Sequence, residues 1–214
     1  CKMHIEKIEL QNFRNYNNLE LEFSKNVNLI LGKNAQGKTN LLEAVYLTAI
    51  GRSFRTSKDL DLVKFNENNA IVKVWAEKEL NSTTVEISIK RKGEKSSEKF
   101  IKKDRKNVTK TSQLLKNILI VIFSPEDLKI VKDEPEKRRK FIDRELSQIS
   151  PKYYNSLSNY KKSLLQRNTY LKEDNLEPSI IDLWDMQLAK FGAEVIFLRK
   201  EFIKKLSEYS AKIH

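Results

Sequence analysis

The stretch "LILGKNAQGKTNLLEA", residues 29–44, decides the fold of this chain. An apolar segment leads into a loop with two glycines, and apolar residues at helical spacing follow the loop. Residues 32–39 fit the pattern G-x-x-x-x-G-K-[ST]. Glycines in such a loop let successive backbone N–H groups turn inward around a phosphate, and the positive end of the next helix points at the same anion. The pattern therefore predicts a phosphate-binding loop between a strand and a helix.

The positions of this loop have separate expected roles. Lys38 should reach the β- and γ-phosphates of a nucleotide, and the Thr39 hydroxyl should bind Mg²⁺. ATP and Mg²⁺ are therefore the expected ligands. A chance loop is the alternative, but the strand and helix patterns on its two sides favour nucleotide binding. The expected contacts are Gly32, Lys33, Asn34, Ala35, Gln36, Gly37, Lys38, Thr39 and Asn40.

Residues 1–125 read as an α/β unit that contains the loop and a β-meander. The helix after the loop should end at Gly51. Residues 27–31 and 118–123 are almost entirely apolar, so we expect them to be strands buried inside a sheet. Alternation or β-branched composition predicts the strands: around residues 8–10, 19–23, 27–31, 70–79, 83–92, 99–108 and 118–123.

Residues 126–214 have the pattern of an all-helical lobe. Pro135, Pro151 and Pro178 can each occupy the first turn of a helix. The last helix should continue to about Ile213 without a stop signal, so the chain is expected to be truncated before a C-terminal ATPase half. Aromatic residues at helical spacing favour a core over a base-stacking platform: Phe141, Tyr153, Tyr154 and Tyr160.

A P-loop ATPase also needs an acidic residue that emerges from a strand end and completes the Mg²⁺ site. The best candidate strand is 118–123, but Ser124 and Pro125 separate it from Glu126 and Asp127. We therefore expect no catalytic residue within this chain, which should bind ATP with little hydrolysis. Glu126 or Asp127 could sense the γ-phosphate, or could equally cap the next helix.

The chain has 41 Lys and Arg against 29 Asp and Glu, a formal net charge of +12. Such an excess favours binding to polyanions, nucleic acid before membrane surfaces. Residues 90–110 alone hold ten basic and three acidic residues. This predicted hairpin could contact DNA phosphates without sequence preference, or could be a solvated edge protected against aggregation. Residues 137–140 are also all basic, which fits a DNA surface or an ordinary exposed helix face.

Other features of the composition exclude several classes of protein. No apolar run approaches the ~20 residues of a membrane span, and no signal peptide precedes the first strand. Cys1 is the only cysteine, so no disulfide framework is expected, and a cytoplasmic location follows. His4 and His214 lie at opposite ends of the chain and suggest no metal site beyond Mg²⁺.

Four stretches together resemble the RecF family of bacterial recombination-repair ATPases, which is related to SMC and ABC-type heads. The stretches are "LQNFRNY", "GKNAQGKTNLLEAVYL", "GRSFRTSKD" and "FSPEDLKIVKDEPEKRRKFID". The similarity runs from Ile5 to at least Arg167, and the last stretch is the most specific. One departure is Asp133-Glu134, where family members usually carry Gly-Ser.

The resemblance implies an ABC-type P-loop ATPase head followed by a helical insertion, with weak DNA-dependent ATPase activity in the full-length protein. It implies binding to double-stranded and gapped DNA at single-strand/double-strand junctions, where the family helps to load the recombinase. RecR and RecO are the implied mediators, and ATP would join two heads into a homodimer. The family's signature motif and second acidic motif would follow residue 214.

By position, Arg14 in "NFRNY" matches an arginine that reaches the nucleotide phosphates in SMC-like heads. The alternative is a turn arginine paired with a neighbouring acid. Two other functions remain open from the residues alone. One is a P-loop kinase of a small molecule, which the meander suits poorly; the other is a basic DNA-binding module with a vestigial nucleotide loop.

Overall fold

A computed structural model describes residues 3–78, 81–123 and 134–213. The chain divides into two compact units, residues 1–120 and 121–214, each of which is described by itself. The boundary expected after residue 125 lies outside the described residues. Among the helices of the described residues, none is long and apolar enough to cross a membrane.

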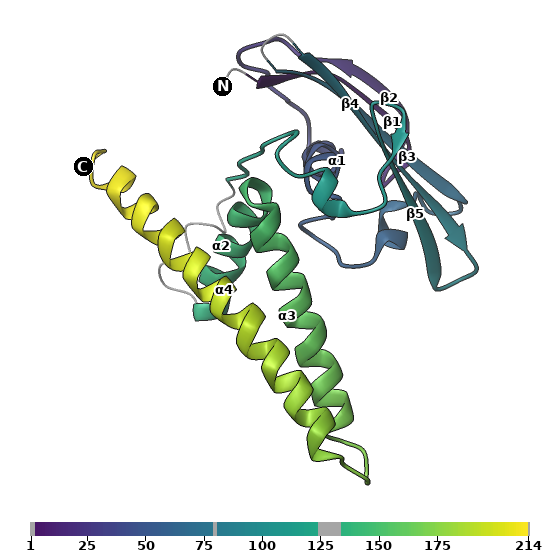
Figure 1. Ribbon diagram of the computed structural model, residues 1–214. Helices are drawn as coiled ribbons and strands as arrows, with labels where there is room; N and C mark the ends of the chain where they lie inside the picture. Colours follow the sequence, from purple (N-terminus) through teal and green to yellow (C-terminus); the bar gives the residue numbers. More distant parts are fainter. Residues whose placement is uncertain (1–2, 79–80, 124–133, 214) are drawn as a thin grey trace. The chain divides into compact units, whose positions relative to one another are not determined.

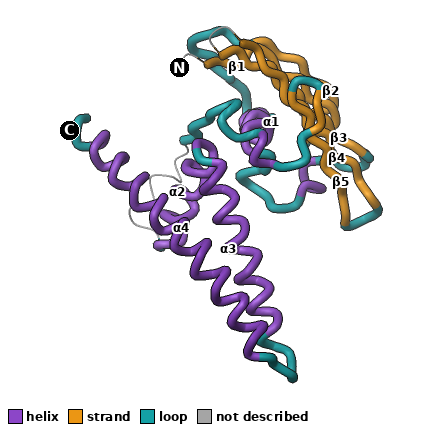
Figure 2. Tube along the Cα trace, viewed as in Figure 1, coloured by secondary structure: helices purple, strands orange, loops and turns teal. Residues whose placement is uncertain are grey.

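The first unit is a six-stranded antiparallel sheet with a helix against one face (Figure 1). The strands lie in the order β2-β1-β3-β4-β5-β6, and helix α1 spans Lys38–Ile50. Figure 2 shows the strands in orange and the short helix α1, in purple, beside them. The strand bounds are β1 Met3–Phe13, β2 Tyr16–Glu22, β3 Asn69–Lys78, β4 Asn81–Lys92, β5 Ser96–Lys103 and β6 Lys106–Asn107.

Alternation along the strands separates a core face from an outer face. Val72, Val74 and Ile87 are buried, whereas the residues between them are partly exposed. Helix α1 covers the core face with buried side chains that include Leu41 and Leu47. Burial of these side chains is the main stabilising contribution to the unit, because each removes apolar surface from water.

The predicted meander and the predicted helix are confirmed. Gly51 caps α1 with φ 75°, a left-handed conformation that glycine adopts without steric cost. The third meander strand was predicted as one segment, residues 99–108, and is interrupted. Asp104 and Arg105 have φ values of 49° and 66° and form a turn between β5 and β6. Short 3-10 helices lie at Asp59–Leu62 and Thr111–Gln113.

The prediction of buried strands at residues 27–31 and 118–123 is wrong for this chain. Neither segment pairs with a described strand, and both are irregular. Val27 is 85% exposed and Val121 is likewise 85% exposed. An apolar run becomes a strand only when a neighbouring strand accepts and donates its backbone hydrogen bonds, and the composition of the run does not supply that neighbour.

The described residues of the second unit form three helices, as predicted: α2 Pro135–Ile149, α3 Pro151–Tyr170 and α4 Pro178–Ser210. Each helix begins at its predicted proline, and α3 and α4 pack side by side as a hairpin (Figure 1). The fold class predicted from the sequence, an α/β unit followed by a helical lobe, is confirmed.

The core of the helical unit contains a buried polar network. Tyr153 is fully buried and donates a hydrogen bond to Asp143, which also pairs with Arg199 at 2.6 Å. Burial raises the pKa of Tyr153, and the neighbouring Asp143 carboxylate raises it further. The predicted core role is thus confirmed for Tyr153, whereas Phe141, Tyr154 and Tyr160 are only partly buried.

Candidate nucleotide-binding site

The phosphate loop joins residue 31 to the start of α1. Gly37 lies directly before the helix with φ 105°, and Ala35 also has a positive φ of 64°. The N-cap residue of α1 is Gly37, which has no side chain to cap the helix, and the first turn of α1 contains no acidic residue. The first backbone N–H groups and the positive end of the helix dipole are therefore arranged to receive an anion.

Lys38 points back into the loop that precedes it. Its ammonium donates hydrogen bonds to the carbonyl oxygens of Gly32 at 2.6 Å and Lys33 at 2.7 Å. The positive charge is thus held at the centre of the loop, where a phosphate could replace a carbonyl as the acceptor. Residues 33–36 are exposed, and so is Thr39.

The turn between β1 and β2 supports the loop from one side. Asn15 donates through Nδ2 to the Gln36 carbonyl at 3.1 Å and accepts from Asn40 at 2.8 Å. The Tyr16 hydroxyl donates to the Gly37 carbonyl at 3.2 Å. A Cβ at Gly37 would lie 2.7 Å from the Asn15 side chain, so the close approach of turn and loop requires glycine there.

Arg14 extends from the same turn to α1. Its guanidinium donates to the Glu43 carboxylate through Nε at 2.9 Å and Nη2 at 2.7 Å. It also donates to the Asp61 carbonyl at 2.8 Å. This is the arrangement of a turn arginine paired with an acid, the alternative left open above. Contact of Arg14 with a nucleotide stays a prediction.

Glu43 is the centre of a buried polar network beneath the loop. Its side chain has no exposed surface, and it accepts hydrogen bonds from Arg14, Ser53 and Arg55. Burial alone would raise the pKa of Glu43. The hydrogen bonds of Arg14 and Ser53 and the charges of Arg14 and Arg55 outweigh burial, so the pKa lies below its ordinary value. Glu43 is therefore ionised and fixes the first turns of α1 to the β1–β2 turn.

A comparison with protein families matches residues 7–214 to the model described as an AAA domain. This chain belongs to that AAA domain family. Curated relatives include the DNA replication and repair protein RecF of Clostridium tetani, 46% identical over 99% of this chain, and that of Clostridioides difficile, 43% identical over 99%. The chain spans 57% and 56% of the lengths of these two relatives.

Two solved structures of RecF proteins have the same fold. A structure of the recombination mediator protein RecF with ATPrS, from the RecFOR pathway, matches with a TM-score of 0.89 and 39% identity. The matched region covers 96% of this chain and 55% of the solved chain. The ATP complex of RecF matches with a TM-score of 0.87. The RecF resemblance inferred from the sequence is confirmed.

The donor set of the loop fits the Mg-ATP expected for an AAA domain. Lys38 and the backbone amides are donors for phosphate, and the Thr39 hydroxyl is a ligand of the type that Mg²⁺ accepts. Glu43 lies one turn beyond Thr39 but is not suited to bind the metal, because its oxygens face Arg14, Ser53 and Arg55. Glu126 and Asp127 lie outside the described residues.

Sequence reasoning missed Glu43, Ser53 and Asn15 as parts of this site. The available signal was an acid inside an apolar helix face, since Tyr46 and Leu47 follow Glu43 at helical spacing. A buried acid needs a cationic partner. The identity of that partner could not be predicted, because Arg14 is 29 residues away in the chain.

His4, from which no metal site was expected, lies near two acidic residues. His4 lies at the end of β1, where its ring nitrogen is 3.3 Å from the carboxylate of Glu77 on β3. Together with Glu6, the two residues place three potential metal-ligand atoms within 4.8 Å of one another. Lys25 also pairs with Glu77 at 3.4 Å. These side-chain contacts connect β3 to β1 and to the segment after β2.

Proposed function

We propose that this chain is the nucleotide-binding part of a RecF-type DNA-repair ATPase. The observation that carries the proposal is the Lys38 ammonium, held at the centre of a phosphate loop whose helix N-terminus has no side-chain cap. Curated relatives carry the name DNA replication and repair protein RecF, and solved relatives are complexes with ATP or ATPrS.

In this proposal the chain's own residues bind and orient the triphosphate. The loop amides and Lys38 would hold the phosphate oxygens, and the Thr39 hydroxyl would hold Mg²⁺. The metal, when bound, neutralises charge on the phosphates. The Arg14–Glu43 pair and Asn15 act as positioning groups, because they fix the β1–β2 turn against the backbone of the loop.

The proposed activity is weak DNA-dependent ATP hydrolysis in the longer protein, with little hydrolysis by these 214 residues. The acid that completes the metal site was not found in the sequence. Glu43, the acid one helical turn beyond Thr39, is engaged with two arginines. Binding energy from the loop can persist without such an acid, whereas transition-state stabilisation cannot.

The proposed macromolecular substrate is DNA, bound through its phosphates. The support is the basic hairpin, residues 90–110, which comprises the end of β4, β5 and β6. Lys99 points inward, to Asp59 at 2.9 Å and the Gly51 carbonyl at 2.9 Å. Lys102, Arg105 and Lys106 are exposed on the outer side and remain the candidates for phosphate contacts.

The proposed partners follow from the solved relatives, which belong to a RecFOR recombination pathway. We propose that the longer protein acts at single-strand/double-strand junctions with RecR and RecO and helps to load the recombinase. An ATP-dependent homodimer and a cytoplasmic location complete the proposal.

A calorimetric titration of the chain with Mg-ATP, with and without a gapped DNA duplex, tests this function. We expect a 1:1 nucleotide complex and DNA binding that falls with salt. Absence of nucleotide binding would contradict the phosphate-loop assignment. Nucleotide binding with no DNA affinity at low salt would contradict the repair function while leaving the ATP site intact.

A further inference from the structure

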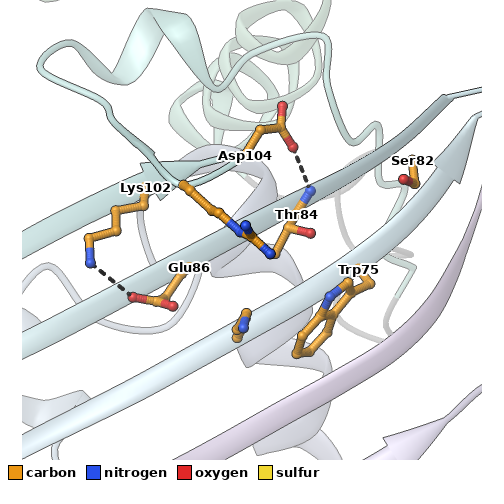
Figure 3. Close-up of a pocket in the computed structure, with 8 residues that line it drawn as sticks. Trp75, Ser82, Thr84, Glu86, Lys102 and Asp104 are labelled. Atoms are coloured by element: carbon orange, nitrogen blue, oxygen red, sulfur yellow. Dashed lines mark hydrogen bonds and ion pairs between the residues drawn. The ribbon is translucent and has the colours of Figure 1, made fainter.

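The outer face of the sheet is hollowed over β3 and β4, opposite the face that packs against α1 (Figure 3). The hollow has a volume of about 370 Å³, within the lower range of small-molecule pockets. Trp75 of β3 lies in it, with Thr84 and Glu86 of β4 and Lys102 of β5 around it. We refer to this hollow, together with Lys73, Asp104 and Arg105 on its lining, as the Trp75 basin.

Trp75 lies on the outer face because its neighbours Val74 and Ala76 are buried in the core. Two ammonium groups lie over its indole ring, that of Lys73 at 4.4 Å and that of Lys7 at 5.1 Å from the ring centre. A large π-surface beside cations on a solvent-facing sheet is a combination that proteins use to bind unpaired bases. Lys7 also pairs with Glu9 at 2.9 Å and with Glu20, so Lys73 is the cation that a base would displace.

The carboxylates of the basin are occupied by structural contacts. Asp104 accepts from the Thr84 backbone N–H at 2.8 Å and from the Thr83 hydroxyl at 3.1 Å. Glu86 lies 3.7 Å from the Lys102 ammonium, which is half exposed. The basin lining therefore has three cations against two anions that are already partnered, and it attracts a phosphate.

Arg105 lies in the two-residue turn that joins β5 to β6. Asp104 and Arg105 both have positive φ, as the tight turn of a two-residue hairpin loop requires. The Asp104 contacts to β4 stabilise this turn and keep Arg105 at the edge of the basin. The guanidinium of Arg105 is thereby placed on the lining of the basin, beside the ammonium of Lys102.

We propose that the Trp75 basin binds one unpaired nucleotide of single-stranded DNA. The base lies against the Trp75 indole in place of a lysine ammonium, and its phosphate contacts Lys73, Lys102 and Arg105. The proposal rests on the DNA-binding function proposed above and adds to it a subsite for the single-stranded side of a junction. Paired bases are excluded, because in a duplex their faces are stacked on each other.

Tryptophan fluorescence gives a direct test, since the chain has two tryptophans, Trp75 and Trp184. In the Trp184→Phe variant, Trp75 is the only tryptophan and reports on the basin alone. Titration with an oligothymidylate should quench its emission in a saturable manner. A blunt duplex of the same length should leave the emission unchanged at equal occupancy, measured by anisotropy.

A pair of substitutions at position 75 separates stacking from structure. Trp75→Ala should weaken oligothymidylate binding about tenfold, as loss of one base–aromatic stack predicts. Trp75→Phe should restore most of that affinity. Neither variant should change the affinity for duplex DNA or the salt dependence of duplex binding. Circular dichroism provides the control that both variants remain folded.

Three outcomes would overturn the proposal, and each is distinct. Unchanged oligothymidylate affinity in Trp75→Ala would show that the basin is not a base-binding site. Equal quenching by thymidine monophosphate and by the oligomer, at the same concentration, would identify a free-nucleotide site instead. In either of these two cases, duplex binding that is retained would leave the proposed DNA-repair function intact. The third outcome is that the unsubstituted chain binds no DNA at all, which would overturn both the basin proposal and the DNA-repair function.

Discussion

Arg14 of the β1–β2 turn and Glu43 of α1 form a two-point ion pair beneath the phosphate loop, with donor–acceptor distances of 2.9 Å and 2.7 Å. The Glu43 carboxylate has no exposed surface, whereas the Arg14 side chain is 19% exposed. The pair connects the strand layer to the helix that follows the loop, so the position of the loop depends on a contact between distant parts of the chain.

Arg14→Ala should destabilise the chain by about 3 kcal/mol, because it leaves a buried carboxylate without its main partner. Urea denaturation measures the effect. Arg55→Ala is the matched control: its guanidinium is 43% exposed and contacts the same carboxylate at 3.3 Å, so we expect a loss below about 1 kcal/mol. Equal losses for the two variants would contradict the central role of Arg14.

The lowered pKa of Glu43 predicts a pH dependence of stability. Because the folded-state pKa lies below the ordinary value of 4.5, the ion pair stabilises the fold fully above that pH. This stabilisation is lost as the pH falls from about 4.5 through the folded-state pKa. The stability difference between the unsubstituted chain and Glu43→Gln should therefore shrink below pH 4.5. A difference that stays constant from pH 7 to pH 3 would refute this assignment.

Lys38→Ala should weaken Mg-ATP binding at least tenfold, or about 1.4 kcal/mol, because it removes the ammonium at the centre of the loop. Isothermal calorimetry measures the affinity. Lys200→Ala, an exposed lysine of α4, removes the same charge from the helical unit and should bind Mg-ATP normally. Normal affinity in both variants would eliminate the phosphate-loop assignment.

Replacement of Lys102, Arg105 and Lys106 by glutamate should weaken duplex DNA binding and flatten its dependence on salt, because fewer counterions are released. Lys99→Ala is the internal comparison within the same hairpin. Lys99 faces Asp59 and the Gly51 carbonyl, so its loss should lower the unfolding midpoint and leave the salt slope unchanged. If the triple substitution leaves the slope unaltered, the hairpin is only a solvated edge.

ATP turnover by these 214 residues should be far below that of a chain extended to the length of the RecF relatives, while ATP affinity changes much less. The loop binds the ground state, but the acid that positions water is not expected here. A steady-state assay of phosphate release by both chains measures the turnover. Light scattering in the presence of ATP measures the oligomeric state of the 214-residue chain, which we expect to be a monomer. Equal turnover would place the acid within residues 1–214 and make Glu126 and Asp127 the first residues to substitute.

Local patterns in the sequence determined the helices and the phosphate loop. Pro135, Pro151 and Pro178 start the helices of the second unit, and Gly51 ends α1. These signals act within a few residues, because fixed φ angles and helix-end hydrogen bonds are local properties. The alternation along β3 and β4 likewise identified the buried face of the sheet.

Only the tertiary structure decided which distant groups meet. The apolar runs at residues 27–31 and 118–123 looked like buried strands, but a strand exists only where another strand completes its hydrogen bonds, and none of the described strands does so. Arg14 could pair with a phosphate or with an acid, and the structure selected Glu43 because the turn after β1 brings Arg14 within hydrogen-bond distance of α1. The sequence by itself determined the chemistry of the loop, whereas long-range packing determined its supports.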